Sequence, residues 1–510
     1  MYIQPQTNIR ILKDVPLDNT YGHTIYFSSA SAQHSYFSGK QKYNLINYTY
    51  QRVNKGVARV GIKSDSLYDC NYMMFQNTAY GTKWFYAFIT SVEFVNNECS
   101  EITFELDVMQ TWFFDYDMEY SLVEREHVDD DVAGFHIEPE NVELGEYVFN
   151  DYKNLSPVLN PLAVYILVND TDEASSGNVY DGVYGGCKLY AYNLSDTSGI
   201  NSRINTYNQK PDAIVGMYMA PVIGTGTAIP DGGMRVVYSA NAYTVSGEAE
   251  AVNVGSWEID GYKPKNRKLF TYPYNFFSIG NNDGSSLALR YEFFEGRKPQ
   301  WNIRVPITMP IQCTLRPTNY KGSTGVFPNE SLTLSNYPMC SWSTDAFRAW
   351  LAQNAIPIIA NSGVKIGTGA VIGGLPMAGA SLLSSATNAL VSGYQASIQA
   401  DITKGNQNHG NNNVASGLQS FYGGRCSITK YYARMIDEYF TMFGYAIHRV
   451  KIPNRNGRPH WNYVKTIGCN IVGSVPADDM RKICNIYDAG VTFWKNGDEI
   501  GNYSLDNTIY

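Results

Sequence analysis

The side chains that most often bind metals or act as acids and bases are scattered along this 510-residue chain. No two histidines stand in the HxH or HExxH spacing that brings zinc ligands together on one strand or helix. The consecutive carboxylates Asp129, Asp130 and Asp131 suit a hard cation, but they lack the Gly and the distal Glu of a calcium loop. We therefore expect no metal site, and we expect the acidic segment from Asp129 to Gly145 to be a solvated linker. The histidines are at positions 23, 34, 127, 136, 409, 448 and 460.

Motifs of catalysis and of cofactor binding are also missing from the sequence. Gly224-x-Gly226 and Gly367-x-Gly369 resemble pieces of phosphate-binding loops, yet neither continues to a third Gly at dinucleotide spacing or to GK[ST]. The sequence has no GxSxG, no Cys/His arrangement that would activate a nucleophile and no convincing carboxylate pair. We expect no cofactor and no enzymatic activity.

Basic and aromatic side chains alternate near the C-terminus. They are His448, Arg449, Lys451, Arg455, Arg458, His460 and Trp461. Such a cluster suits a nucleic-acid contact or an interface between subunits, where Arg and Trp are enriched. The net charge of −8 and the absence of a denser basic patch favour the interface.

The most unusual stretch of the sequence has almost no charged side chains. From Leu351 to Ala400 the only charged side chain is Lys365. Interior Gly residues cost a helix in water about 1 kcal/mol each, and Pro376 removes a backbone donor. In lipid, unpaired backbone groups cost several kcal/mol, and about 20 apolar residues are enough to cross a bilayer. We therefore predict a conditional membrane segment in a protein that is otherwise not embedded in a bilayer.

The residues expected to act in this segment fall into two sets. The apolar side chains expected to meet lipid are Ile356, Ile358, Ile359, Val364, Ile366, Val371, Ile372, Leu375, Met377, Leu382, Leu383, Leu390 and Val391. The residues expected to keep the loop pliable or to allow close helix packing are Gly363, Gly367, Gly369, Gly373, Gly374, Pro376 and Gly379. Two pairs among the glycines have GxxxG spacing, which lets membrane helices approach closely.

The rest of the chain reads as mainly β. Aromatic residues make up 14 % of the chain and Tyr alone contributes 40 residues, a composition typical of sheets and large interfaces. The alternation from Glu101 to Met109 predicts a half-buried strand, and Trp84–Phe94 predicts a central strand joined to it through a turn at Asn96-Asn97. Further predicted strands are Ala163–Val168, Leu287–Phe294, Val491–Trp494 and Gly501–Leu505; predicted helices are Asp345–Asn354, Thr429–Phe443 and Ala477–Asp488.

The cysteines and the N-terminus indicate where the chain is made. The eight cysteines stand singly without a CxxC pair, which favours free thiols in a reducing cytosol. The first residues have neither a basic nor an apolar signal region, so we expect no signal peptide.

Several motifs resemble one family. Asn8–Pro16, Tyr72–Phe88, Phe104–Trp112 and Val123–Val128 resemble the tail knob protein of short-tailed phages that infect Gram-positive bacteria. Further matches are Lys268-Leu269, Tyr272–Tyr274, Phe443–Lys451, Trp461–Val464 and Gly501–Ser504. The matches are colinear, cover roughly 8–127 and 425–505 well, and form islands in the middle of the chain.

The resemblance implies a fold and a role. The fold would be mainly β with some α, with tandem barrel- or sandwich-like tail-tube domains that form a hexameric tube. The implied domains are an N-terminal tube domain at 1–127, completed by an α+β segment at 421–510, a middle tube domain at 128–345 and a hydrophobic loop at 346–420. The loops would plug the lumen and leave it on infection to penetrate the host membrane.

The resemblance also implies partners and a location. The partners would be five further copies of the chain, other tail and collar proteins, lipids of the host cytoplasmic membrane, and DNA that passes through the lumen without sequence-specific binding. The protein would lie at the tail tip of the virion after assembly in the host cytoplasm. The alternatives are a receptor-binding adhesin with the apolar stretch as buried core, and a cell-wall hydrolase.

Overall fold

The computed structural model describes the backbone of residues 6–48, 56–79, 81–155, 162–169, 188–193, 196–207, 210, 213–221, 229–236, 243–281, 284–305, 313–322, 331–334, 339–341 and 420–509. The chain divides into two compact units, each described by itself below. Unit 1 comprises residues 1–145, 261–269 and 430–510, and unit 2 comprises residues 146–260 and 270–429. The chain is mainly β, as the sequence predicted.

Unit 1 contains a six-stranded antiparallel sheet with the strand order β3-β1-β5-β6-β7-β4. Its strands are β1 (Thr7–Lys13), β3 (Gln41–Tyr48), β4 (Val57–Val60), β5 (Cys70–Asn77), β6 (Phe85–Asn96) and β7 (Cys99–Leu106). The predicted hairpin is confirmed, since β6 and β7 pair from Ala87 with Leu106 to Asn96 with Cys99. The alternation in β7 is confirmed too, because every second residue from Ser100 to Leu106 is buried.

The predicted ends of these two strands are partly wrong. β7 stops at Leu106, and Val108 lies in the short helix α2 (Val108–Thr111). Asp107, expected on an exposed face, is buried and caps α2 by accepting from the Gln110 N–H at 3.0 Å. In β6 only the first part is buried, whereas Phe94 near the hairpin end is 61 % exposed. The strand is central by pairing but not buried along its whole length.

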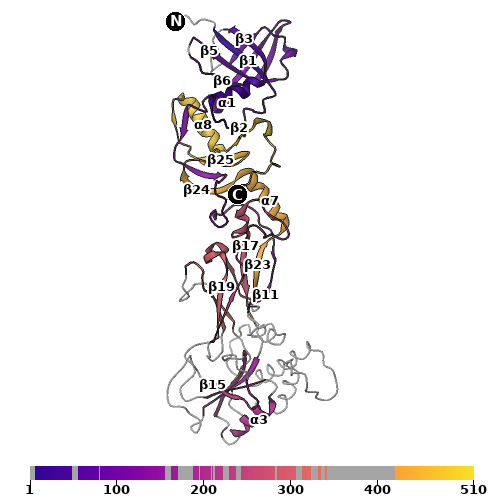
Figure 1. The fold of residues 1–510 in the computed structure, drawn as a ribbon, viewed down its shortest axis with the longest axis vertical. Coiled ribbons are helices and arrows are strands. Elements are labelled where there is room, and N and C mark those ends of the chain that lie inside the picture. Colours follow the sequence, from indigo (N-terminus) through magenta and orange to yellow (C-terminus); the bar gives the residue numbers. More distant parts are fainter. Residues whose placement is uncertain are drawn as a thin grey trace. The chain divides into compact units, whose positions relative to one another are not determined.

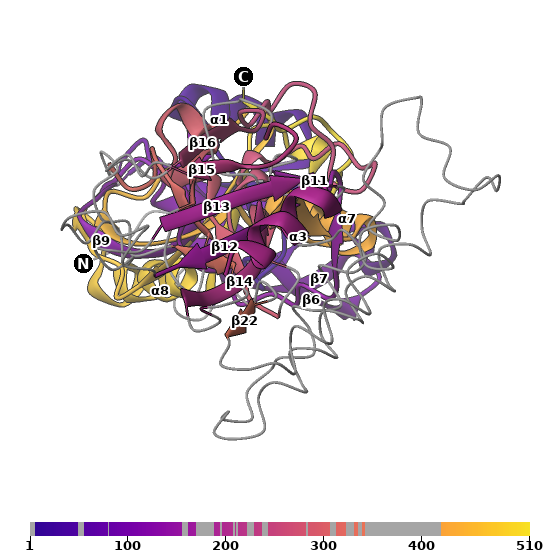
Figure 2. The same cartoon turned by 90° about the horizontal axis from the view of Figure 1, so that it is seen from below.

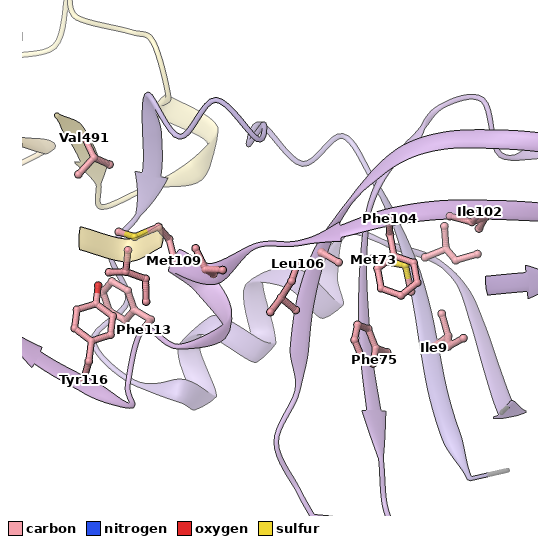
Figure 3. Packing of buried hydrophobic residues seen from close by; sticks show 14 of the residues in the cluster. Ile9, Met73, Phe75, Ile102, Phe104, Leu106, Met109, Phe113, Tyr116 and Val491 are labelled. Carbon is pink, nitrogen blue, oxygen red and sulfur yellow. The ribbon is translucent and has the colours of Figure 1, made fainter. Parts of the chain in front are cut away.

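One hydrophobic cluster joins this sheet to the C-terminal part of unit 1. Figure 3 shows Ile9, Met73, Phe75, Ile102 and Phe104 on the sheet, with Met109, Phe113, Tyr116 and Val491 farther along the same cluster. Ile483 and Tyr487 of helix α8 (Ala477–Ala489) belong to it as well. Residues about 370 positions apart therefore share one core, which a local sequence pattern cannot show.

The C-terminal segment adds a five-stranded sheet with the order β2-β27-β25-β9-β24. Its strands are β2 (His23–Ile25), β9 (Ser121–Glu126), β24 (Tyr445–Lys451), β25 (Trp461–Ile467) and β27 (Val491–Trp494). Unit 1 also has the two-stranded sheet β8 (Tyr116–Met118) with β26 (Ile471–Gly473), and helix α1 (Ala30–Gly39). The predicted strand at Gly501–Leu505 is wrong, because these residues form turns.

Both predicted C-terminal helices are confirmed. Helix α7 (Lys430–Phe443) buries Ala433, Ile436, Asp437 and Phe440 on one face, as in an amphipathic helix. Gly444 follows it with φ of 65°, the left-handed conformation that ends many helices. Helix α8 has Asp478 and Asp479 in its first turn, where carboxylates interact favourably with the helix dipole.

The described part of unit 2 contains three sheets. The first has the order β15-β13-β12-β14-β22 and is seen in Figure 2, with helix α3 (Thr197–Thr206) close to β13. Its strands are β12 (Leu162–Val168), β13 (Lys188–Asn193), β14 (Ile214–Pro221), β15 (Met234–Val236) and β22 (Met339–Ser341). The predicted strand at Ala163–Val168 is confirmed as β12.

The second and third sheets complete the described part of unit 2. One has the order β10-β23-β17-β18 with β11 beside β23, and the other has the order β16-β19-β20-β21. Their strands are β10 (Tyr147–Phe149), β11 (Lys153–Asn154), β16 (Tyr243–Glu248), β17 (Asn275–Gly280), β18 (Ser286–Leu289), β19 (Gln300–Val305), β20 (Cys313–Pro317), β21 (Leu332–Leu334) and β23 (Tyr422–Ile428). The predicted strand Leu287–Phe294 is only half right, since β18 ends at Leu289 and the turn of 3₁₀ helix η6 (Tyr291–Phe293) follows.

Candidate functional site

The predicted membrane-active residues, from Ile356 to Val391, lie outside the residues that the structure describes, as does the predicted helix Asp345–Asn354. Among the described residues no helix is both long and apolar enough to cross a membrane. What the structure does describe are the two strands that flank the stretch. β22 precedes it and β23 follows it, so the chain leaves one sheet of unit 2 and returns to another. The candidate site is therefore the place where the chain re-enters the described structure after the apolar stretch, at strand β23.

The returning strand β23 is held from both sides. It pairs antiparallel with β17 from Asn275 opposite Ser427 to Gly280 opposite Tyr422 (Figure 1). On its other edge it pairs with β10 and then with β11. The chain between β10 and β11 departs from regular pairing at Asp151, whose carboxylate accepts from the Arg425 N–H at 2.8 Å. Hence β23 is an interior strand over its whole length.

Two consecutive glycines in β23 make this close packing possible. A Cβ atom at Gly424 would overlap the carbonyl group of Asp151, and one at Gly423 would lie 2.6 Å from the carbonyl oxygen of Ser278. Real Cβ atoms essentially never come so close to backbone. The need for Gly here is steric, because no side chain fits between the two backbones.

Arg425 fixes the same strand to the loop before β17. Its guanidinium lies 4.5 Å from the centre of the Trp257 ring, and its Nη1 donates to the Glu258 carbonyl at 3.0 Å. Trp257 contacts Tyr291 edge to face at 5.2 Å. Burial raises the pKa of Tyr291, so that hydroxyl stays neutral. These residues line a polar cavity of about 630 Å³ that also includes Glu250. Because Arg425 is already engaged, the arrangement positions β23 and offers no nucleophile with a base.

In unit 1, segments far apart in the sequence are joined by buried ion pairs. The carboxylate comes from the acidic segment that was expected to be a solvated linker. The Glu140 carboxylate is fully buried and accepts from Lys268 Nζ at 2.5 Å, from Arg125 and from the Ala446 N–H at 2.8 Å. Burial lowers the pKa of Lys268, while the Glu140 carboxylate opposes this shift. The segment has no helix or strand and ends at Gly145, where unit 2 follows, as a linker should, but the expected solvation is wrong at Glu140, whose buried carboxylate pairs with two cations.

A second pair of carboxylates continues this polar core. Asp131 is buried and accepts from the Tyr445 hydroxyl at 2.8 Å. Asp437 of α7 is 1 % exposed and accepts from the Tyr262 hydroxyl at 2.7 Å and from two N–H groups of Asn266 at 2.9 Å. All three segments of unit 1 thus meet at buried carboxylates. Within the described ranges no cluster of three or more His, Cys, Asp or Glu side chains suits a metal ion.

The basic and aromatic cluster of the C-terminal part divides into two groups. Arg458 and Trp461 are buried inside unit 1, so for these two residues both the nucleic-acid and the interface prediction are wrong. Trp461 packs on Trp494 with ring centres 5.1 Å apart. His448 and Arg449 of β24 are exposed, so the interface prediction stays open for them. Sequence reasoning missed Glu140 and Asp437, since their partners are far along the chain.

Comparison with known proteins agrees with this architecture. Residues 238–508 match the family model of the C-terminal domain of the tail knob protein gp9 of Bacillus phage phi29. Residues 5–117 match the model of the N-terminus of caudoviral major tail proteins. The tail knob protein gp9 of phage phi29 is 27 % identical over 99 % of this chain and 98 % of its own length. That of Bacillus phage B103 is 26 % identical with the same coverage.

A solved structure shows the same fold. The tail knob protein gp12 of bacteriophage C1 superposes with a TM-score of 0.61 at 15 % identity, covering 98 % of this chain and 99 % of that one. Fold and site thus define a structural protein of a phage tail, not an enzyme. The chain belongs to the family of the tail knob protein gp9 of Bacillus phage phi29, and it is a tail component of the virion.

Proposed function

We propose that six copies of this chain form the distal tube of the tail and that their hydrophobic loops, residues 346–420, plug the lumen until infection. On infection the loops leave the tube and penetrate the host cytoplasmic membrane, so that DNA passes through the lumen without sequence-specific contacts. Other tail and collar proteins hold the tube at the tail tip. The division into 1–127 with 421–510, 128–345 and 346–420 is part of this proposal.

The observation that carries the proposal is the stretch from Leu351 to Ala400, in which Lys365 is the only charged side chain. An apolar surface of this length aggregates in water unless other apolar surface covers it, and it is long enough to cross a bilayer. After it, beyond the polar residues 401–419, the chain enters β23, which is paired on both edges. Copies of the stretch that bury one another inside a tube are covered from water before infection, and each copy is still long enough to cross a bilayer after release.

Dye release from liposomes tests the membrane step. We expect intact protein to release the dye and a variant with residues 355–420 replaced by a short Gly-Ser linker to lose this activity. Leu375→Lys with Ile372→Lys is the finer test, because two charges in the centre of the stretch raise the cost of insertion. A matched control places Lys at Val57 and Ile46, which are exposed on unit 1. Equal leakage from intact and deleted protein contradicts the proposal.

Electron microscopy of the purified protein tests the tube. We expect rings with six-fold symmetry, both for intact protein and for the deleted variant, since the wall is built from the flanking sheets. Binding to isolated cell walls without any liposome leakage would instead support a receptor-binding adhesin.

A further inference from the structure

Two cysteines that stand apart in the sequence meet in the fold of unit 1. Cys469 lies in the turn between β25 and β26, and Cys484 lies on α8. Both are free, half-buried thiols that pack against the hydrophobic cluster of unit 1. The Cys469 thiol donates a hydrogen bond to the Cys484 sulfur, so the two side chains are in direct contact.

The backbone around this pair is also held in place. Helix α8 packs against β25, the strand before the turn (Figure 1). Asp488 Oδ1 accepts from the Cys469 N–H at 3.0 Å and from the Thr466 hydroxyl at 2.7 Å. Asp488 follows Cys484 by one helical turn, so their side chains lie on the same face of α8. The turn is therefore tied to the helix face that carries Cys484, which keeps the two sulfurs near each other.

Both thiols are protonated near neutral pH. Burial raises the pKa of Cys469 to about 12 and also raises that of Cys484, and the Asp488 carboxylate adds to both shifts. The hydrogen bond from Cys469 acts in the other direction on the pKa of Cys484, because it stabilises the Cys484 thiolate. The thiolate is the nucleophilic form of cysteine, so Cys484 is the sulfur that attacks first. Within the described residues no third ligand completes a metal site beside the pair.

We propose that Cys469 and Cys484 are an oxidation site, which a small-molecule disulfide converts into an intramolecular disulfide that fastens α8 to the turn before β26. Cys484 loses its proton to solvent and attacks one sulfur of the small disulfide, whose other sulfur leaves and takes up a proton. Cys469 then loses its proton and attacks Cys484 Sγ, and the second small thiol leaves. Two protein thiols thus lose two electrons and two protons, and the small disulfide is reduced to two thiols.

The bond would fasten the helix that joins the two main sheets of unit 1. Ile483 and Tyr487 of α8 belong to the hydrophobic cluster that both sheets share, and the Tyr487 hydroxyl is 3.1 Å from that of Tyr116. A virion tail component leaves the reducing interior of the cell when the virion is released, and disulfides persist in the medium outside. Fastening would therefore follow release. This inference does not depend on the proposed hexamer or on the proposed loop.

Oxidised glutathione added to the folded full chain tests the site. Remaining thiols are blocked by alkylation, and trypsin then cuts after Arg481 and Lys482, which places the two cysteines in separate peptides, residues 466–481 and 483–495. We expect mass spectrometry to find these peptides linked, and to find them separate after reduction. Closing a loop of about 15 residues should also slow hydrogen exchange in α8 about 100-fold relative to the reduced protein.

Two variants give matched controls. Cys469→Ser should stop the reaction at the mixed disulfide between Cys484 and glutathione, with no linked peptides. Cys99→Ser removes another half-buried thiol of unit 1, on β7, and should form the link like the unmodified protein.

The deciding result is read in the unmodified protein, so a variant that fails to fold does not affect it. Unlinked peptides after oxidation of the folded chain, or glutathione attached to each cysteine separately, would overturn the inference. Linked peptides with unchanged exchange in α8 would overturn it as well, because the bond would then not fasten the helix.

Discussion

The contacts that stabilise unit 1 internally differ in kind from those that stabilise unit 2. In unit 1, segments that are more than 100 residues apart meet at buried carboxylates, namely Asp131, Glu140 and Asp437. In unit 2, strand β23 is fixed by the absence of side chains at Gly423 and Gly424 and by the stack of Arg425 on Trp257. The stability of unit 1 should therefore depend on charge and pH. The stability of unit 2 should depend on the volume of the side chains at the close contacts of β23. Hydrogen exchange read out by mass spectrometry separates the two units in the intact chain.

The largest effect is expected from Gly424→Ala in unit 2. The new Cβ would overlap the Asp151 carbonyl, so β23 has to give up its pairing on one edge. We expect a loss of more than about 4 kcal/mol in the stability of β23, seen as fast exchange in residues 420–428. Gly255→Ala is the control, since its nearest neighbour is the Asn253 side chain at 3.4 Å. Equal exchange in both variants would show that β23 is not fixed by close backbone packing.

Glu140→Gln should cause the next largest effect, confined to unit 1. It leaves Lys268 and Arg125 buried without their carboxylate, which typically costs about 3 kcal/mol or more. The control is Glu438→Gln, which removes an exposed ion pair with Arg434 and should cost less than about 0.5 kcal/mol. Urea unfolding monitored by hydrogen exchange gives both values. If the two variants are equally stable, the buried carboxylate does not distinguish unit 1 from unit 2.

Asp107→Asn should instead stabilise unit 1 at neutral pH. Burial raises the pKa of Asp107 to about 6 in the folded protein, against 3.8 in the unfolded chain. The protonated carboxyl therefore stabilises the fold fully below pH 3.8, and this stabilisation is lost as pH rises through 6. Asn keeps Oδ1 as the acceptor for the Gln110 N–H, and its Nδ2–H donates to the Tyr72 hydroxyl oxygen, which reverses the bond that this hydroxyl donates to the Asp107 carboxylate at 2.7 Å. We expect a gain of about 3 kcal/mol at pH 7 and none at pH 3.5. A gain that does not change with pH would contradict this assignment.

His127→Asn should have the smallest effect at pH 7 and the opposite pH dependence. The His127 Nδ1 accepts from the Tyr463 N–H at 2.8 Å, so its Nε2–H donates to the Thr441 carbonyl at 3.1 Å. Burial, with Arg458 nearby, lowers its pKa to about 3. The contribution of neutral His127 to stability is therefore complete above pH 6.5 and is lost as pH falls toward 3.

The variant lacks one hydrogen bond, so its free energy of unfolding should be about 1 kcal/mol lower at pH 7. Between pH 6.5 and 4 its free energy of unfolding should fall less than that of the unmodified protein. Urea unfolding of both proteins at these two pH values measures the difference. Parallel pH profiles would mean that His127 takes up a proton in the folded protein.

The sequence predicted those elements whose signal is local. The alternation predicted from Glu101 to Met109 was confirmed as far as Leu106. The period of α7 and the end signals of α8, Asp478-Asp479 and Gly490, are visible within 15 residues, and both helices were confirmed. The acidic segment was misjudged because the cations that pair with Glu140 stand at positions 125 and 268, so its composition alone resembles a solvated linker. Trp461 was misjudged for a similar reason, since its partner Trp494 is 33 residues away on another strand. The hydrophobic stretch itself stays a prediction from composition.

The position of β23 also has a mechanical consequence. The chain enters this strand at Ser420 and Phe421, after the hydrophobic stretch and the polar residues 401–419. A pull on the stretch acts along β23, so the hydrogen bonds to β17 and to β10 and β11 bear the load together. Bonds that must break simultaneously resist far more force than bonds that open one by one. The sheet that contains β23 would then keep its pairing while the chain that precedes it is pulled.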